Sequence, residues 1–320
     1  AGGTMTGNIV LGTNTIGGLY ITTTATNNLG LGTNAVNSIT TGDGNVGLGD
    51  EAGTAITTGN YNTIVGLNAL KANTTGSNNT AIGQAALLTN TTASDNTAVG
   101  LYALLLNTTG DKNVAVGSLA LDANTTGSDA VAIGYGALGS NTTGGLSVAI
   151  GKNALTANTT ANAQVAIGEF ALTANTTGTR NVAVGSSTLR VQTTANDNTA
   201  VGYQANRYNT TGSENTSVGS FSLGANTTGG QNTALGESAL ISLGANTTGS
   251  DNDAFGHNAL AANTTGASNV AMGHEALYNN TTGAQNVAIG NKAGDSVTTA
   301  EKNTFIGRNA GATVTTGSQN

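Results

Sequence analysis

Short apolar runs recur along the chain at one constant interval. Each run has three residues and ends at a glycine, as in residues 114–117, Val-Ala-Val-Gly. This glycine recurs in constant steps of 17, as at Gly100, Gly117 and Gly134, over 32–236 and again over 256–307. A longer step precedes each stretch: it begins at Gly12 before the first stretch and at Gly236 before the second. A fixed period of this kind indicates a repeat protein in which equivalent residues of successive units stack on one another.

One repeat unit predicts extended structure and turns rather than helix. Residues 113–127 read NVAVGSLALDANTTG, and the glycines and β-branched residues in every unit disfavour a helix. Strand alternation places Val114 and Val116 on one face and Ala115 on the other. The leucine of the Ala-Leu pair is a second apolar anchor, and the Asn-Thr-Thr triplet combines a turn former with strand-favouring threonine. Each unit therefore supplies two short extended segments and two corners.

A single coil of this kind cannot bury its apolar side, whereas stacked coils can. We therefore predict an all-β fold, a parallel β-solenoid or β-roll of 17-residue coils, with about 4.8 Å between coils. The array occupies residues 28–320, and residues 1–27 form an N-terminal connector. The period alone leaves a triple β-spiral open, in which the repeats advance along a shaft without coiling.

Two sets of residues are predicted to line the interior. The aliphatic residue before each repeat glycine and the leucine of each Ala-Leu pair form the core, so aspartate at Val116 would place a charge in the core at a cost of several kcal/mol. The asparagines of the Asn-Thr-Thr triplets recur in one register and can form an amide ladder. The predicted core residues are Val99, Val116, Ile133, Ile150, Ile167, Val184, Leu104, Leu121, Leu138 and Leu155. The predicted ladder residues are Asn73, Asn90, Asn107, Asn124, Asn141, Asn158 and Asn175.

The alanine at the centre of each apolar run is predicted to face away from this core. A solvent-facing position would normally vary toward charged residues, but this one stays small and uncharged. We therefore predict a close contact with a neighbouring chain, the seam of a homotrimer; a tight corner in a monomeric coil is the alternative. The predicted seam residues are Ala98, Ala115, Ala132, Ala149, Ala166 and Ala183.

Composition narrows the classes of function. Charged residues make up 8% of the chain, against roughly a quarter in typical globular proteins, and the net charge is −7. Nine Lys and Arg residues against 16 Asp and Glu residues disfavour a nucleic-acid partner. Absence of cysteine excludes disulfides and thiolate metal sites, and no apolar run approaches the ~18 residues of a membrane helix, so we expect no membrane insertion. The opening residues, AGGT, suggest a longer or processed polypeptide.

Candidate chemistry is sparse. His257 and His274 are one repeat period apart and should stack on adjacent coils. They are either ordinary surface residues or, in a trimer, imidazoles from three chains that could surround a metal ion. No carboxylate recurs at a matching offset, so we expect no metal site and no cofactor. A smooth solenoid offers little concave pocket, and the chain has no Gly-x-Ser-x-Gly elbow. We expect no catalytic residues and no enzymatic activity.

Two stretches carry a resemblance to known families. Residues 147–155, SVAIGKNAL, are similar to the head repeats of trimeric autotransporter adhesins, which form trimeric left-handed parallel β-rolls. The whole unit, over roughly residues 28–320, resembles the arrays in bacteriophage and cyanophage tail fibres and related bacterial surface proteins. Residues 2–12, GGTMTGNIVLG, are similar to a motif of phage tail fibre proteins.

The resemblance implies a homotrimeric shaft of a virion tail fibre that supports host-cell attachment. Its implied partners are copies of itself, other tail or fibre proteins and host surface glycans, and its implied location is the virion. A bacterial surface adhesin or extracellular filament of the same architecture, at the cell surface, is the alternative. Aligned threonine pairs such as Thr108 and Thr109 leave a third interpretation open, an ice-binding β-solenoid.

Overall fold

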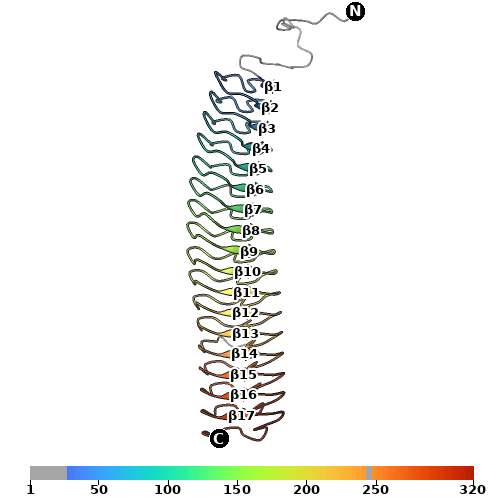
Figure 1. The fold of residues 1–320 in the computed structure, drawn as a ribbon, viewed down its shortest axis with the longest axis vertical. Helices are drawn as coiled ribbons and strands as arrows, with labels where there is room; N and C mark the ends of the chain where they lie inside the picture. Colours follow the sequence, from blue (N-terminus) through green and yellow to red (C-terminus); the bar gives the residue numbers. More distant parts are fainter. Residues whose placement is uncertain (1–26, 243–246) are drawn as a thin grey trace, which may run out of the picture. The chain divides into compact units, whose positions relative to one another are not determined.

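The computed structural model describes residues 27–242 and 247–320, so almost all of the predicted connector lies outside the described residues. The chain divides into two compact units, residues 1–143 and 144–320. In each unit the chain winds in coils that carry one short strand apiece (Figure 1). The described residues contain no helix long and apolar enough to cross a membrane.

The first unit contains seven three-residue strands in one parallel sheet. Each strand pairs with the strand of the next repeat, and Val114 lies opposite Val131. The strands are β1 (Leu29–Leu31), β2 (Val46–Leu48), β3 (Thr63–Val65), β4 (Thr80–Ile82), β5 (Thr97–Val99), β6 (Val114–Val116) and β7 (Val131–Ile133).

The second unit repeats this arrangement with ten strands. Its register advances by one repeat period from strand to strand, except between β13 and β14, where the insertion makes Thr233 pair with Asp253. The strands are β8 (Val148–Ile150), β9 (Val165–Ile167), β10 (Val182–Val184), β11 (Thr199–Val201), β12 (Thr216–Val218), β13 (Thr233–Leu235), β14 (Asp253–Phe255), β15 (Val270–Met272), β16 (Val287–Ile289) and β17 (Thr304–Ile306). Pairing of consecutive repeats within one chain confirms the predicted parallel β-solenoid and is inconsistent with a triple β-spiral.

Two tight turns bring the chain around after each strand. In the coil of β6, the amide of Ala120 donates to the Gly117 carbonyl at 3.3 Å, and the amide of Asn124 donates to the Leu121 carbonyl at 3.1 Å. Leu121 adopts a left-handed backbone, with φ 52°. The predicted second extended segment, Asn-Thr-Thr, is not a strand, but its backbone bonds the next coil through the Thr125 amide and the Thr142 carbonyl at 2.8 Å.

The orientation of the strands is the reverse of the prediction. Ala115 has no exposed surface, whereas Val114 and Val116 on either side of it are partly exposed. The same pattern holds at the other predicted core positions in strands, so assigning these residues to the core was wrong: Val99, Val116, Ile133, Ile150, Ile167 and Val184. The predicted core leucines are fully buried: Leu104, Leu121, Leu138 and Leu155.

Limited interior space explains this orientation. Where Ile64 replaces the strand-centre alanine, Gly53 replaces the core leucine of the preceding coil, and a Cβ on Gly53 would lie 2.5 Å from Ile64 Cδ1. Phe305 is accommodated in the same way, because a Cβ on Gly294 would lie 2.8 Å from its Cδ2. A large residue at one inner position therefore requires glycine at the other. A strand that follows a coil with leucine at this position has room only for alanine at its centre.

The predicted oligomer seam is corrected by the same observation. The strand-centre alanines are covered by their own chain, so they have no surface to offer a neighbouring chain: Ala98, Ala115, Ala132, Ala149, Ala166 and Ala183. Their persistent small size reflects packing inside the coil. A contact between chains would instead involve the residues on either side of them.

Candidate functional site

A ladder of buried asparagines runs through the first unit at the Asn-Thr-Thr positions. The side-chain amide of Asn90 donates to Asn73 Oδ1 at 3.0 Å, that of Asn107 to Asn90 Oδ1 at 3.0 Å, and that of Asn124 to Asn107 Oδ1 at 2.9 Å. Asn107 also donates to the Gly110 carbonyl at 2.9 Å, which closes the turn of its own coil. All seven predicted ladder residues are buried: Asn73, Asn90, Asn107, Asn124, Asn141, Asn158 and Asn175. In the first unit the ladder therefore satisfies buried polar groups and holds the coils in register. In the second unit Asn175 donates to the Gly178 carbonyl at 2.9 Å, but its Oδ1 accepts no hydrogen bond.

A second asparagine ladder, absent from the sequence prediction, lies directly before the strands. Asn62 is typical: its backbone amide and its side-chain amide both donate to Asn45 Oδ1, at 3.0 and 2.9 Å. Its side chain also donates to the Gly76 carbonyl at 3.0 Å. The signal is present in the sequence, because asparagine precedes most of the apolar runs.

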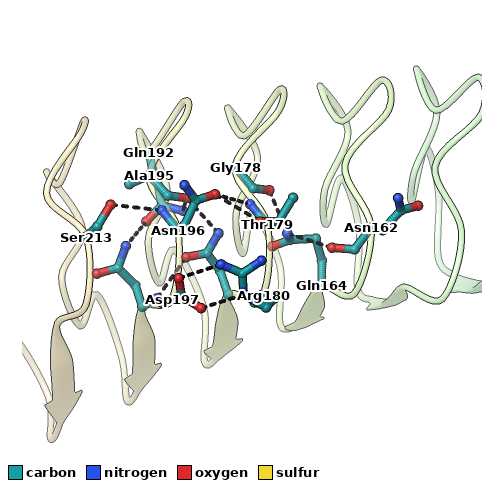
Figure 2. Close-up of polar contacts among 12 residues, drawn as sticks. Asn162, Gln164, Gly178, Thr179, Arg180, Gln192, Ala195, Asn196, Asp197 and Ser213 are labelled. Carbon is teal, nitrogen blue, oxygen red and sulfur yellow. Dashed lines mark hydrogen bonds and ion pairs between the residues drawn. The ribbon is translucent and has the colours of Figure 1, made fainter.

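A third set of polar side chains lies outside the coil, in the turn before each strand (Figure 2). The Thr179 amide donates to Asn196 Oδ1 at 2.7 Å, and the Asn196 amide donates to Ser213 Oγ at 3.1 Å. Beside them, Arg180 donates from Nε and Nη2 to the two carboxylate oxygens of Asp197, both at 2.7 Å. The hydrogen bond from Arg180 lowers the pKa of the exposed Asp197 carboxyl. These contacts join neighbouring coils and leave no free charge at this place.

Other titratable groups on the surface do not form a reactive cluster. The rings of His257 and His274 stack with centroids 5.1 Å apart, as their spacing predicts. Glu275 Oε2 lies 3.8 Å from His274 Nδ1 and 3.1 Å from Lys292 Nζ. In the first unit, burial raises the pKa of Asp122. Within 27–242 and 247–320, no three His, Cys, Asp or Glu side chains gather as metal ligands.

The first and third residues of every strand form what we call the outer strand face. The third residue is apolar in all strands of both units, and Ile167, Val218 and Met272 keep 37–42% of their surface exposed. In the second unit, the only charged residue that the described strands place on this face is Asp253. A continuous column of partly exposed apolar side chains is unusual on a monomer and typically marks an interaction surface.

The threonine pairs do not form a double outward array. The Thr108 hydroxyl donates to the Thr125 carbonyl of the next coil at 2.9 Å, and this first threonine is only partly exposed. The second threonine, Thr109, is exposed. Because the first hydroxyl of each pair is used between coils, only one threonine column faces the solvent. This arrangement gives little support to an ice-binding surface.

One core position breaks the pattern of the second unit. Asn206 occupies a position that leucine holds in the adjacent coils, at Leu189 and Leu223, and it is fully buried. Neither Nδ2 nor Oδ1 of its side chain has a hydrogen-bond partner. A buried amide without partners destabilises the folded state, because it loses its hydrogen bonds to water.

Replacing Asn206 by leucine should therefore stabilise the second unit. The backbone angle φ is 48° at Asn206 and 49–50° at the two neighbouring leucines, so the new side chain meets a conformation that leucine already adopts here. We expect a gain of about 2–4 kcal/mol from removing the unpaired amide and burying an aliphatic side chain. Urea denaturation followed by circular dichroism measures this change.

Asn209→Leu is the matched control, since Asn209 lies in the same coil and is also buried. Its side chain donates to Gln192 Oε1 at 3.1 Å and to the Gly212 carbonyl at 2.8 Å. Leucine there should destabilise the unit by breaking the ladder. A loss of stability in Asn206→Leu would contradict our interpretation of this position.

The chain matches no protein-family model, and a comparison with curated proteins returned no match. The fold itself defines the class: a repeat protein built as a parallel β-solenoid. The features that bear on its role are therefore the outer strand face and the polar ladders described above.

Proposed function

We propose that the protein is a structural shaft, assembled from three copies of this chain, in a virion tail fibre that supports host-cell attachment. The observation that carries the proposal is the outer strand face. Its third-residue positions are apolar in every strand, yet these side chains remain partly exposed in the single chain. A second copy that covers this face would remove the apolar surface from water, which favours association.

A copy of the same chain suits this face better than an unrelated partner does. The side chains repeat at the spacing of the coils, about 4.8 Å, so two identical faces can pack in register along their whole length. The face carries almost no charge, and its burial therefore has little desolvation cost. The resemblance to tail-fibre and adhesin repeats supports three copies around an axis.

The proposed role is mechanical, and we assign no catalytic residue. The polar side chains of the ladders are occupied in bonds between coils, which stabilise the stack rather than leaving groups free to react. A bacterial surface adhesin is the second candidate, because residues 147–155 resemble adhesin head repeats. Gold-labelled antibodies against the chain should decorate the tails of virus particles; decoration of a bacterial envelope instead would favour the adhesin.

The assembly can be tested by light scattering coupled to size-exclusion chromatography. The chain should elute at about three times its mass of 31.1 kDa. Lysine at Val116 and Ile167 on the outer strand face should give a folded monomer, because association would bury unpaired charges. Lysine at the exposed Thr109 and Thr177 is the matched control and should leave the trimer intact. A monomeric wild-type chain would refute the proposal.

A further inference from the structure

Cationic and aromatic side chains gather on the turns that follow strands β8 to β11 of the second unit. They come one to six residues after a repeat glycine, so they lie apart from the outer strand face. We call this cluster the arginine–tyrosine patch. Its members are Lys152, Phe170, Arg190, Tyr203, Arg207 and Tyr208.

The rings and the cations of the patch are in contact. The guanidinium carbon of Arg190 lies 5.1 Å from the centroid of the Phe170 ring, and Lys152 Nζ lies 5.4 Å from the same centroid. The guanidinium carbon of Arg207 lies 5.0 Å from the Tyr208 ring centroid. Tyr203 and Tyr208 nevertheless keep about half of their surface exposed, 50% and 49%. The patch therefore presents accessible ring surface beside fixed positive charges.

The two arginines occupy the same position on adjacent coils without a carboxylate between them. Their backbones are in register, because the Val191 amide donates to the Arg207 carbonyl at 3.3 Å. Among the described residues, the Arg190 guanidinium has no hydrogen bond or ion pair. Arg207 donates only from Nη1, to Gln204 Oε1 at 2.7 Å, and its Nε is buried without a partner.

Unpaired like charges on neighbouring strands or coils repel each other, so this arrangement is unfavourable unless an anion binds. The Glu169 carboxylate lies 3.6 Å from Lys152 Nζ and so offsets that charge rather than the arginines. Arg180 of the same unit differs from these two arginines, because Asp197 on the next coil forms an ion pair with it and neutralises its charge. The patch is thus a local positive site in a chain whose net charge is −7.

The coil that carries three of the six patch residues is also the coil whose core contains the unpaired amide of Asn206. Residues 202–209 read GYQANRYN, where the other coils of the array typically have GxxALxxN. Asn206, with its unpaired buried amide, lies in the chain directly before Arg207. Places where a repeat departs from its own stabilising pattern are expected to be functional.

We propose that the arginine–tyrosine patch binds an acidic oligosaccharide. A carboxylate or sulfate of one sugar would lie between the guanidiniums of Arg190 and Arg207, and a sugar ring would stack on the exposed face of Tyr203 or Tyr208. The coil spacing of about 4.8 Å is close to the length of one sugar residue, so successive sugars can meet successive coils. Three cations in a negatively charged chain are too few to favour a nucleic acid.

The probe for this site is a short oligogalacturonate, titrated by calorimetry at low salt. We expect saturable binding to the full chain and no measurable binding of the fully methyl-esterified oligomer, which keeps the rings but lacks the charge. Polyglutamate of equal charge tests for an acidic peptide as the ligand. Equal affinity for polyglutamate, or no binding of oligogalacturonate, would overturn the proposal.

Variants locate the site. The double variant R190Q/R207Q should weaken oligogalacturonate binding about tenfold or more, because two charge-assisted contacts are lost. Tyr203→Ala should also weaken it, and Arg180→Gln, which removes one positive charge elsewhere in the unit, should not. Equal weakening by Arg180→Gln would show nonspecific attraction. The elution mass of each variant, measured separately, tests the proposed assembly independently of binding.

Discussion

Aspartate at position 115 is expected to abolish folding of the first unit. Ala115 lies at the centre of β6 with no exposed surface, and the coil interior around it has no room or partner for a carboxylate. An uncompensated buried charge costs about 3–5 kcal/mol, a large share of the total stability of a typical domain. Loss of the β-sheet circular dichroism signal at neutral pH would report the effect.

The neighbouring position supplies the control. Val116 follows Ala115 in the same strand but lies on the outer strand face, so Val116→Asp should keep the β-sheet spectrum and lose only the association of chains. The sequence pattern predicts the opposite, with Val116 as the position that cannot carry a charge. A folded Ala115→Asp protein beside an unfolded Val116→Asp protein would reverse our orientation of the strand.

Alanine at the repeat glycine should be the second severe change. Gly117 has φ 135°, a conformation that side-chain-bearing residues rarely adopt, and a Cβ there would lie 2.6 Å from the Gly134 carbonyl oxygen. The obstacle is the backbone of the next coil, which cannot move without breaking the pairing of β6 with β7. We expect Gly117→Ala to destabilise the unit by about 3 kcal/mol or more, measured by thermal unfolding.

A second glycine of the same unit, Gly139, supplies a control for the expected loss of stability. Gly139 has no left-handed backbone, and the nearest atoms to an added Cβ are Asp122 Oδ1 and the Gly136 carbonyl oxygen, both at 3.3 Å. Gly139→Ala should stay within about 1 kcal/mol of the wild type, since the new methyl group also restricts the unfolded chain. Similar melting temperatures for the two variants would contradict the tight approach of coils at Gly117.

The period of the sequence was sufficient to predict most of the architecture. Glycines at a constant interval place Val114 beside Val131, and this one relation sets the parallel pairing, the coil length and the stacking of Asn90 on Asn73. Local chemistry was equally informative at the Asn-Thr-Thr turns, because asparagine both closes the turn and reaches the next coil. Stacking of His257 on His274 follows from the same arithmetic.

Other features depended on distances between side chains inside the coils, which a period does not contain. Strand alternation separates Ala115 from Val114 and Val116 but does not say which face is inside. A large residue, Ile64, at the strand centre is paired with glycine, Gly53, at the leucine position of the preceding coil. This pairing indicates that the volume inside the coils determines which strand face points inward.

The amino-acid sequence alone identifies an all-β repeat protein in which equivalent residues of successive coils stack. The physical reason is that one short repeat cannot bury its apolar side chains by itself, whereas repeats of constant length can bury them against one another. The three-dimensional arrangement added the direction of each side chain. It turned the predicted seam into the core and the predicted core into an outer surface. Those outcomes depend on the narrow interior of the coil and on contacts across it, and neither is encoded in residue spacing.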